Sequence, residues 1–417
     1  MGATVEQLYT ERLTRVEDAI QLKEPDRVPF FPLTHFLAAK YAGITSEEAF
    51  YDIDKWLAAN RVMIEGLEPD IYFPTVAAYP GSALDALECK QMKWPGRGIP
   101  PGSTFQYIEG EYMKADEYDA FLDDPSDYLI RTYLPRIFGN LEPLKTLPSI
   151  KTLFLYGYKG AVTSAAFVVP EIAGAFMALY EAGAEARKYL TATAAFDTEM
   201  AERGFPPAFG GASVYVPFDI FSDVFRGMRG TMLDMYRQPD KLLEAMARVF
   251  PILVQGAVSG AKRSGNPRVF IPLHRGADGF MSAKQFETFY WPGLKKLVLA
   301  LIDEGLTPCP FFEGNYTSRL EYLTDFPKGK VLGLFDSTDL FHAKEVLGDT
   351  MCLAGNMPLS LLQSGTPEEI REYSKKLIDV VGKDGGFIMS SRTVLDDASP
   401  ELVKVWANFT REYGAYR

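Results

Sequence analysis

Eight short apolar runs, most of them followed by a helical pattern, limit what this chain can fold into. The runs lie near residues 29, 70, 213, 270, 309, 332, 352 and 387 of the 417 residues. Short buried strands that alternate with helices are typical of α/β proteins with a parallel sheet. Eight such units predict a (β/α)8 TIM barrel, with an N-terminal helical extension over residues 1–24 and an inserted excursion around residues 80–205.

We expect a single domain over residues 1–417, because barrels with insertions reach this length. Residues 80–115 are rich in proline and glycine and predict a long loop that forms a rim or lid over one end of the barrel. Among the helices, we expect one from Ser46 to Gly66 with Ser46 as N-cap, and one over Ser282–Glu304 that begins with a capping box. A further helix is expected to begin at Thr366, with Pro367 at its first position and Glu369 completing the cap.

Composition and charge exclude several classes of partner. The formal net charge of −12 argues against nucleic acid. The most apolar region, residues 161–182, is interrupted by Pro170 and Glu171, so we expect no transmembrane span and no membrane partner. A cytoplasmic location suits three cysteines that are far apart and form no metal or disulfide motif, Cys89, Cys309 and Cys352.

Polar residues gather just past the predicted strands, where the reactive groups of parallel barrels lie. In the strand–helix–strand unit from Arg268 to Tyr322, both strands end in titratable groups, His274 and Glu313. Each polar residue taken alone has a structural alternative, since Asp219 or Asp336 could equally cap a helix. Together they predict a substrate site that also includes His35, Tyr72, Asp219, Arg275, Phe312, Tyr316, Asn356 and Arg392.

Glu313, His274 and Asp336 are the predicted catalytic residues. Glu313 leaves an apolar strand and precedes Gly314, so its carboxyl group can serve as a general acid or base. The same three side chains could instead bind a divalent metal such as zinc, because borderline ions accept mixed nitrogen and oxygen ligands. The residues alone leave both possibilities open.

Three segments resemble the uroporphyrinogen decarboxylase superfamily. They are the run DRVPFFPLTHF (residues 26–36), residues 217–246, and above all the pattern GNMP…GTPEE…GGFI within residues 353–391. The superfamily includes the tetrapyrrole decarboxylase and cobalamin-dependent methyltransferases. The resemblance implies the same barrel that the strand count predicts.

The sequence departs from the decarboxylases of that superfamily at two places. They resemble one another in an arginine-rich motif after the first strand, where this chain has residues 33–37 without arginine. The histidine that they carry after the last strand is replaced here by Ser390, Ser391 and Arg392. A substrate with many carboxylates needs several cationic partners, so tetrapyrrole decarboxylation is disfavoured.

It also departs from the thiol-directed methyltransferases, whose zinc site uses His-x-Cys and a later cysteine. Aligned through Gly314, the first pair becomes Phe311 and Glu313, and the last cysteine becomes Ser391 or Arg392. The thiolate zinc site is therefore absent, and a zinc ion would depend on His274, Glu313 and Asp336.

The resemblance implies methyl transfer between a small, aromatic or otherwise apolar, methylated substrate and the cobalt of a cobalamin. No Asp-x-His-x-x-Gly corrinoid signature occurs, so we expect the cobalamin on a separate corrinoid-binding protein. Two alternatives are a decarboxylase or lyase, with Arg275 or Arg392 holding a carboxylate, and a non-catalytic barrel that binds a tetrapyrrole or corrinoid. Pairing into a homodimer is a further expectation from the resemblance.

Overall fold

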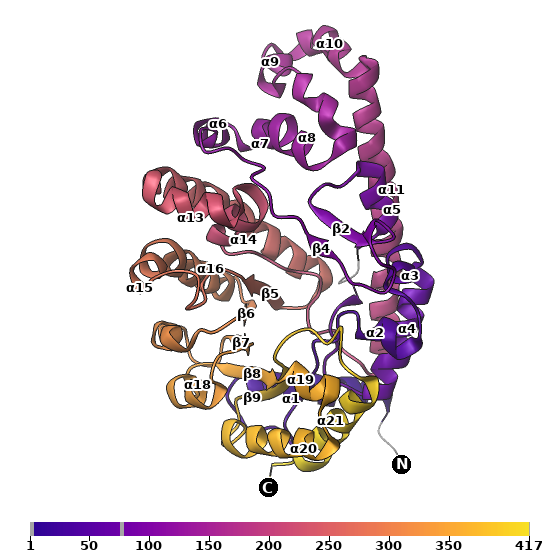
Figure 1. Ribbon diagram of the computed structural model, residues 1–417, viewed down its shortest axis with the longest axis vertical. Coiled ribbons are helices and arrows are strands. Elements are labelled where there is room, and N and C mark those ends of the chain that lie inside the picture. Colours follow the sequence, from indigo (N-terminus) through magenta and orange to yellow (C-terminus); the bar gives the residue numbers. More distant parts are fainter. Residues whose placement is uncertain (1–3, 76–78, 417) are drawn as a thin grey trace.

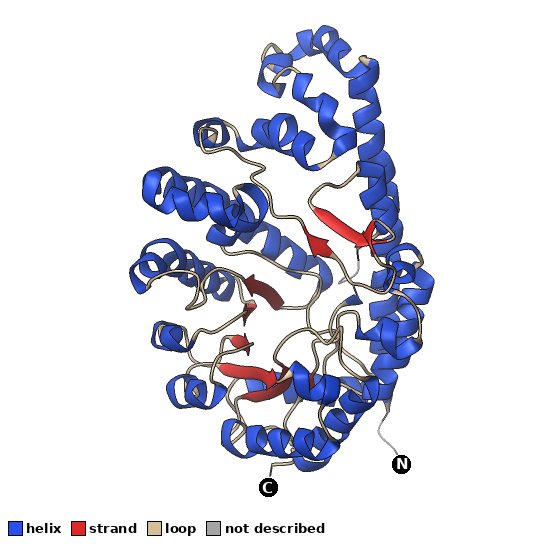
Figure 2. Cartoon of the chain, viewed as in Figure 1, coloured by secondary structure: helices blue, strands red, loops and turns tan. Residues whose placement is uncertain are grey.

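The computed structural model describes residues 4–75 and 79–416, and a parallel sheet lies at its centre (Figures 1 and 2). Its six strands follow the order β1-β9-β8-β7-β6-β5. The strands are β1 (Phe30–Phe31), β5 (Arg268–Leu273), β6 (Thr307–Phe312), β7 (Leu332–Phe335), β8 (Cys352–Met357) and β9 (Phe387–Ser391). The prediction of an α/β fold with a parallel sheet is confirmed.

Backbone hydrogen bonds continue from both edges of this sheet through two irregular segments. At the β1 edge, the amide of Asp70 donates to the carbonyl of Phe30 over 2.9 Å, and the amide of Ala208 donates to the carbonyl of Tyr72 over 2.9 Å. At the β5 edge, the amide of Val214 donates to the carbonyl of Phe270 over 3.0 Å. Residues 206–214 thus contact both continuations, an arrangement consistent with the predicted barrel.

Two of the eight predicted strands are reduced to isolated bridges, Tyr72 with Pro207 and Ser213 with Phe270. Prolines lack the amide that a ladder needs, and Pro206 and Pro207 begin the segment that would pair. The strand character predicted over residues 210–223 is mostly wrong, because Pro217 opens a helical stretch there. Proline at a first helical position is favoured by its fixed φ.

Helices cover the outer side of the sheet and account for most of the remaining chain (Figure 2). Before the insertion lie α1 (Val5–Ile20), α2 (Leu37–Ala42), α3 (Ser46–Tyr51) and α4 (Ile53–Leu67). After it lie α12 (Pro217–Asp219), η6 (Ile220–Phe225), α13 (Gly227–Arg237), α14 (Pro239–Ser264), α15 (Ala283–Gln285), η7 (Phe286–Tyr290), α16 (Trp291–Asp303), η8 (Thr317–Arg319), α17 (Leu320–Leu323), α18 (Leu340–Leu347), α19 (Leu359–Ser364), α20 (Pro367–Lys376), η9 (Leu377–Val381) and α21 (Pro400–Tyr413).

The insertion forms its own layer beside the sheet. It contains a three-stranded sheet of order β3-β2-β4, built from β2 (Met92–Pro95), β3 (Gly98–Ile99) and β4 (Gln106–Tyr107). The helical part ends in the long outer helix α11, which carries α9 and α10 at the top of Figure 1. Its elements are α5 (Gly81–Leu87), α6 (Tyr118–Asp123), α7 (Pro125–Tyr128), η2 (Leu129–Tyr133), α8 (Leu134–Ile137), η3 (Gly139–Thr146), α9 (Ile150–Phe154), η4 (Gly157–Lys159), α10 (Gly160–Thr163), η5 (Ser164–Val168) and α11 (Pro170–Glu202).

Capping chemistry explains where several helices begin. The boxes Ser282 with Gln285 and Thr366 with Glu369 are both formed, as the sequence predicts. The helix predicted from Ser46 to Gly66 is wrong in two details. Thr45 is its N-cap, and Asp52 divides it into α3 and α4 by accepting the amide of Lys55.

One helix of the described residues, α14, is long and apolar enough by length and composition to cross a membrane. Its apolar side, which includes Leu242, Ala245 and Val249, is buried against neighbouring helices. The apolar region around residues 161–182 is not one straight helix, because residues 157–168 and α11 meet at an angle of 89°.

Alternate side chains of the strands join one of two apolar clusters, and buried Cys309 belongs to the smaller one with Leu334 and Ile388.

Candidate active site

A cavity of about 750 Å³ lies past the carboxyl ends of β5, β6 and β7. This volume is within the range of small-molecule sites, roughly 300–1,000 Å³. The excursion forms one wall, and the strand ends and η6 form the rest. The lining residues are Gln91, Tyr107, Ile108, Glu109, Tyr215, Ser222, Asp223, Val224, His274, Arg275, Phe280, Glu313, Gly314 and Asp336.

His274 sits between two carboxylates in this cavity. Its Nδ1 is hydrogen-bonded to Oδ2 of Asp223, and its Nε2 lies 3.4 Å from Oε1 of Glu313. Burial by itself lowers the pKa of His274, but the hydrogen bonds and negative charges of Asp223 and Glu313 outweigh burial and raise that pKa to about 10. His274 is therefore an imidazolium at neutral pH, and its Nε2 proton points toward Glu313.

Asp219 holds the backbone of His274 from below. Its Oδ2 accepts a hydrogen bond of 3.0 Å from the amide of His274 and one of 2.7 Å from the hydroxyl of Tyr290. Asp219 is fully buried, and this burial together with the charge of Asp223 raises the pKa of Asp219 above its ordinary value. Its Oδ1 has no hydrogen-bond partner within the described part of the chain. Asp219 thus fixes where β5 presents His274, without lining the cavity.

Glu313 and Asp336 complete the trio predicted as catalytic. The side chain of Glu313 is 40% exposed, so it is less buried than its apolar strand suggests. Gly314 adopts φ +85°, a conformation that glycine tolerates, and its amide donates to Oδ2 of Asp336 over 2.9 Å. Burial raises the pKa of Asp336. The fold brings Glu313, His274 and Asp336 to one cavity, and their catalytic roles remain predictions.

The cavity carries more negative than positive groups. Its four carboxylates are Glu109, Asp223, Glu313 and Asp336, against two cationic groups, His274 and Arg275. The guanidinium of Arg275 is already paired, because its Nη2 lies 2.8 Å from Oδ1 of Asp223. Its Cζ also lies 5.1 Å from the ring centroid of Phe280. The site as a whole therefore offers little to a substrate with many carboxylates.

Three residues predicted to bind substrate are buried away from the cavity. The hydroxyl of Tyr72 donates to Oδ1 of Asp197 over 2.5 Å. The ring of Phe312 stacks on Phe335 with centroids 4.6 Å apart, and the hydroxyl of Tyr316 donates to the carbonyl of Leu273 over 3.3 Å. All three side chains therefore belong to the buried core and not to the cavity lining.

His35, Asn356 and Arg392 are also absent from the lining of this cavity. The Nδ1 of His35 lies 2.8 Å from Oδ1 of Asp396. The amide group of Asn356 donates to the carbonyls of Asp336 and Thr338, so it holds the loop after β7. The Nε of Arg392 is buried without a hydrogen-bond partner in the described chain.

Asp223, Tyr215, Tyr107 and Glu109 line the cavity but were not predicted. The spacing of Asp223 from Asp219 was an available signal, because residues four apart lie on the same face of a helix. The ring of Tyr215 meets that of His274 edge-on, with centroids 5.6 Å apart. Nothing local marks Tyr107 or Glu109, which reach the cavity only because the excursion folds over it.

The arrangement does not fit the predicted zinc site. Over residues 4–75 and 79–416, no three histidine, cysteine, aspartate or glutamate side chains form a group that could hold a metal ion. Both ring nitrogens of His274 face carboxylates that favour its protonated form, and a metal ligand must be neutral.

Residues 208–413 match the family model described as uroporphyrinogen decarboxylase (URO-D). A uroporphyrinogen decarboxylase from Syntrophotalea carbinolica is 27% identical over 123 residues, which are 30% of this chain and 35% of that protein. One from Chlorobium phaeobacteroides is 23% identical over 192 residues, which are 43% of this chain and 51% of that protein. The chain thus matches about half of the length of these relatives, or less.

A solved structure extends the likeness to the whole chain. A methyltransferase from Methanosarcina mazei superposes with a TM-score of 0.59 over 96% of this chain and 98% of its own, at 15% sequence identity. That likeness shows the fold and includes the excursion. The match to the family model assigns residues 208–413 to the uroporphyrinogen decarboxylase family.

Proposed function

We propose that this chain is a (β/α)8-barrel methyltransferase that moves a methyl group between a small methylated substrate and the cobalt of a cobalamin on a separate corrinoid-binding protein. The observation that carries the proposal is the paired imidazolium and carboxylate of His274 and Glu313 in a cavity rich in carboxylates. Such a pair can hold a proton where a leaving oxygen or nitrogen would need it.

In the proposed reaction, the bond between the methyl carbon and the substrate oxygen or nitrogen breaks. Cobalt supplies the electron pair that bonds the methyl group, and the electrons of the broken bond stay on the oxygen or nitrogen. That atom takes a proton that starts on Nε2 of His274 and passes through the carboxylate of Glu313, so His274 ends the step as a neutral imidazole and Glu313 as a carboxylate. Asp223 holds Nδ1 and so fixes the direction in which this proton is offered.

The cavity favours a neutral aromatic or otherwise apolar substrate. Tyr107, Tyr215 and Phe280 provide ring surfaces, and the carboxylates would repel an anion. A decarboxylase is the second candidate, because the curated relatives carry that name. Against it, Arg275 is neutralised by Asp223 and Arg392 does not line the cavity. A barrel that binds a corrinoid without turnover is the third candidate.

The test is anaerobic incubation of the purified protein with cob(I)alamin and a panel of methoxylated and N-methylated aromatic compounds. Conversion of the cobalt spectrum to that of methylcobalamin supports methyl transfer and names the donor. Release of CO₂ from a carboxylated substrate without any corrinoid would move the assignment to the lyase. Corrinoid binding with no turnover of either kind would favour the non-catalytic barrel.

The variant Glu313→Gln, measured in the same assay, tests whether Glu313 delivers the proton. The amide keeps the shape of the side chain but cannot carry the proton, so turnover should fall by roughly 10²-fold or more. Glu321→Gln is the matched control, because Glu321 is exposed on α17 outside the cavity. Full turnover by Glu313→Gln would show that Glu313 is not the acid.

A further inference from the structure

The excursion supplies one wall of the cavity through residues 107–113, which we call the wall segment. Tyr107, Ile108 and Glu109 line the cavity, yet all three side chains are exposed, so burial in the core does not hold them in place. Residues 108–117 form neither helix nor strand. Other contacts must therefore set the distance between the wall segment and the pair of His274 and Glu313.

Arg226 binds the wall segment from the barrel side. It directly follows η6, and its side chain is only 2% exposed. Its Nη1 donates to the carbonyl of Met113 over 2.6 Å and to the carboxylate of Glu111. Its Nε donates to Oδ2 of Asp234 on α13 over 2.6 Å. A buried guanidinium needs such partners, because an unpaired buried charge is strongly destabilising. Arg226 thus joins the wall segment to α13.

The backbone next to Arg226 also contacts the wall segment. The amide of Met228 donates to Oε1 of Glu109 over 2.8 Å. Gly227 adopts φ +71°, and a Cβ built there would lie 3.1 Å from the carbonyl oxygen of Gly110. The wall segment therefore lies directly against the start of α13, with no space for a larger side chain between them.

The element before Arg226 also holds the proposed acid. Asp223 lies on η6, three residues before Arg226, and is hydrogen-bonded to Nδ1 of His274. We propose that Arg226 is a positioning residue for the proposed methyl transfer, on which this inference rests. By fixing the wall segment against η6 and α13, it sets the width of the space between Tyr107 and the pair of His274 and Glu313, where the substrate binds.

A second arginine, Arg136, contacts the wall segment in a different way. Its Nη1 donates to the carbonyl of Tyr112 over 2.6 Å, and both of its Nη atoms bind Glu117. Arg136 lies on α8, within the same insertion, so this contact fixes the wall segment to the insertion itself. Arg226 differs because its partner Asp234 lies on a helix that follows the insertion, and so it fixes the segment to the barrel.

The variant Arg226→Lys tests this role by steady-state kinetics with cob(I)alamin and the methyl donor. Lysine keeps the positive charge, but a single ammonium cannot reproduce the fork that reaches Asp234 and Met113 together. KM for the donor should rise roughly tenfold or more while kcat changes less than about threefold, because lost ground-state contacts weaken binding without altering the chemical step. A merely structural role would lower the amount of folded enzyme, and so the apparent kcat, and would leave KM unchanged.

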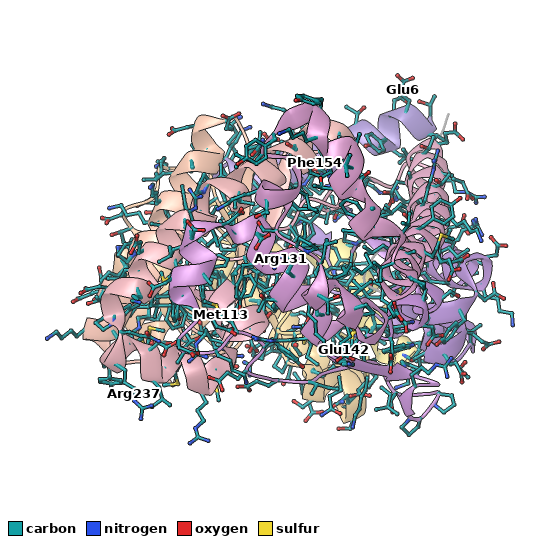
Figure 3. The ribbon with its side chains drawn as sticks, turned by 90° about the horizontal axis from the view of Figure 1, so that it is seen from above. Glu6, Met113, Arg131, Glu142, Phe154 and Arg237 are labelled. Atoms are coloured by element: carbon teal, nitrogen blue, oxygen red, sulfur yellow. The ribbon has the colours of Figure 1, made fainter. Side chains whose placement is uncertain are left out.

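The matched control is Arg131→Lys. Arg131 also pairs with a carboxylate, that of Asp127, and donates to a carbonyl, that of Leu147. Within residues 4–75 and 79–416, the hydrogen bonds of its side chain go to these two residues and none goes to the wall segment. Arg131 and Met113 are both labelled in Figure 3, which views the molecule from above. This control should keep the KM and kcat of the wild type.

Hydrogen exchange of the full-length protein, followed by mass spectrometry, measures the wall segment without any turnover. The amides of residues 107–113 should exchange roughly tenfold faster in Arg226→Lys than in the wild type or Arg131→Lys, because local opening controls exchange in such a segment. If Arg226→Lys does not fold, Gly227→Ala is the second variant, since its methyl group would press on the carbonyl of Gly110. It should raise KM and speed the exchange in the same way.

An unchanged KM in Arg226→Lys would overturn the proposal, as would a wall segment that exchanges at the rate of the wild type. An equal rise of KM in Arg131→Lys would also overturn it, because the effect would then be a general one. A wild type that transfers no methyl group would contradict the proposed function instead, and the exchange of the wall segment would still decide whether Arg226 holds it.

Discussion

Two histidines in this molecule follow a strand and bond an aspartate through Nδ1, yet their surroundings differ. His274 follows β5, bonds Asp223, and turns its Nε2 toward Glu313 in the cavity. His35 follows β1 and bonds Asp396, and its ring centroid lies 4.7 Å from that of Phe36 and 5.7 Å from that of Phe105. A histidine bonded to an aspartate occurs in both places, so that pair alone does not identify a candidate acid.

The difference comes from what faces the second ring nitrogen. A second carboxylate and an open cavity allow His274 to hold and pass a proton. Aromatic rings pack around His35, and within residues 4–75 and 79–416 its ion pair is with Asp396 and with no second carboxylate. Asp396 accepts a hydrogen bond from the amide of Phe36 and is also hydrogen-bonded to Nδ1 of His35. The His35–Asp396 pair therefore connects the loop after β9 to the start of α2. One pair is suited to chemistry and the other to holding two segments together.

The largest expected effect is the difference in the rate of methyl transfer between variants of the two histidines. His274→Gln removes the imidazolium beside Glu313 and should lower the rate of methyl transfer by roughly 10²- to 10⁴-fold, the usual contribution of an acid or base. His35→Gln should change that rate by less than about threefold, since His35 does not line the cavity. Equal losses in the two variants would remove the distinction.

The next effect concerns stability and pH. The pKa of His274 is about 10 in the folded protein, above the value of roughly 6.5 for an unfolded chain. The stabilisation from its charge is therefore complete below about pH 6.5 and is lost as the pH rises toward 10. Within that window the loss should reach about 1.4 kcal/mol per pH unit at most.

Urea unfolding at pH 7 and pH 9 measures this contribution. The free energy of unfolding should fall more steeply with pH in the wild type than in His274→Gln. His35→Gln serves as the comparison and should keep the steep dependence of the wild type. Parallel pH profiles for the wild type and His274→Gln would contradict the raised pKa.

The smallest effect is local. His35→Gln keeps a polar group near Asp396 but loses the ring, so it should lower the free energy of unfolding by about 1 kcal/mol. Urea unfolding at pH 7 measures it, and Asp396→Asn should cost a similar amount because the same contact is weakened. If either change altered the substrate dependence of methyl transfer, His35 would belong to the site after all.

Local signals in the sequence were the most reliable guide to the fold. The capping boxes at Ser282 and Thr366 form as predicted because each depends on residues three positions apart. The strand expected over residues 210–223 failed because apolar runs suit either a strand or a buried helix, and Pro217 favours the helix.

The candidate site also contained a residue whose position the local pattern did not predict. Phe312 was expected in the cavity, but alternation along β6 turns its ring into the core.

By itself, the sequence determined the parallel α/β fold, the family, and the meeting of His274 with Glu313. Those two follow directly after Leu273 and Phe312, which are paired in neighbouring strands, so strand order alone brings them together. Only the tertiary structure decided that Asp223 reaches the other side of His274 and that Tyr107 and Glu109 line the cavity. Those outcomes depend on how separate elements pack against one another, and no local pattern encodes that.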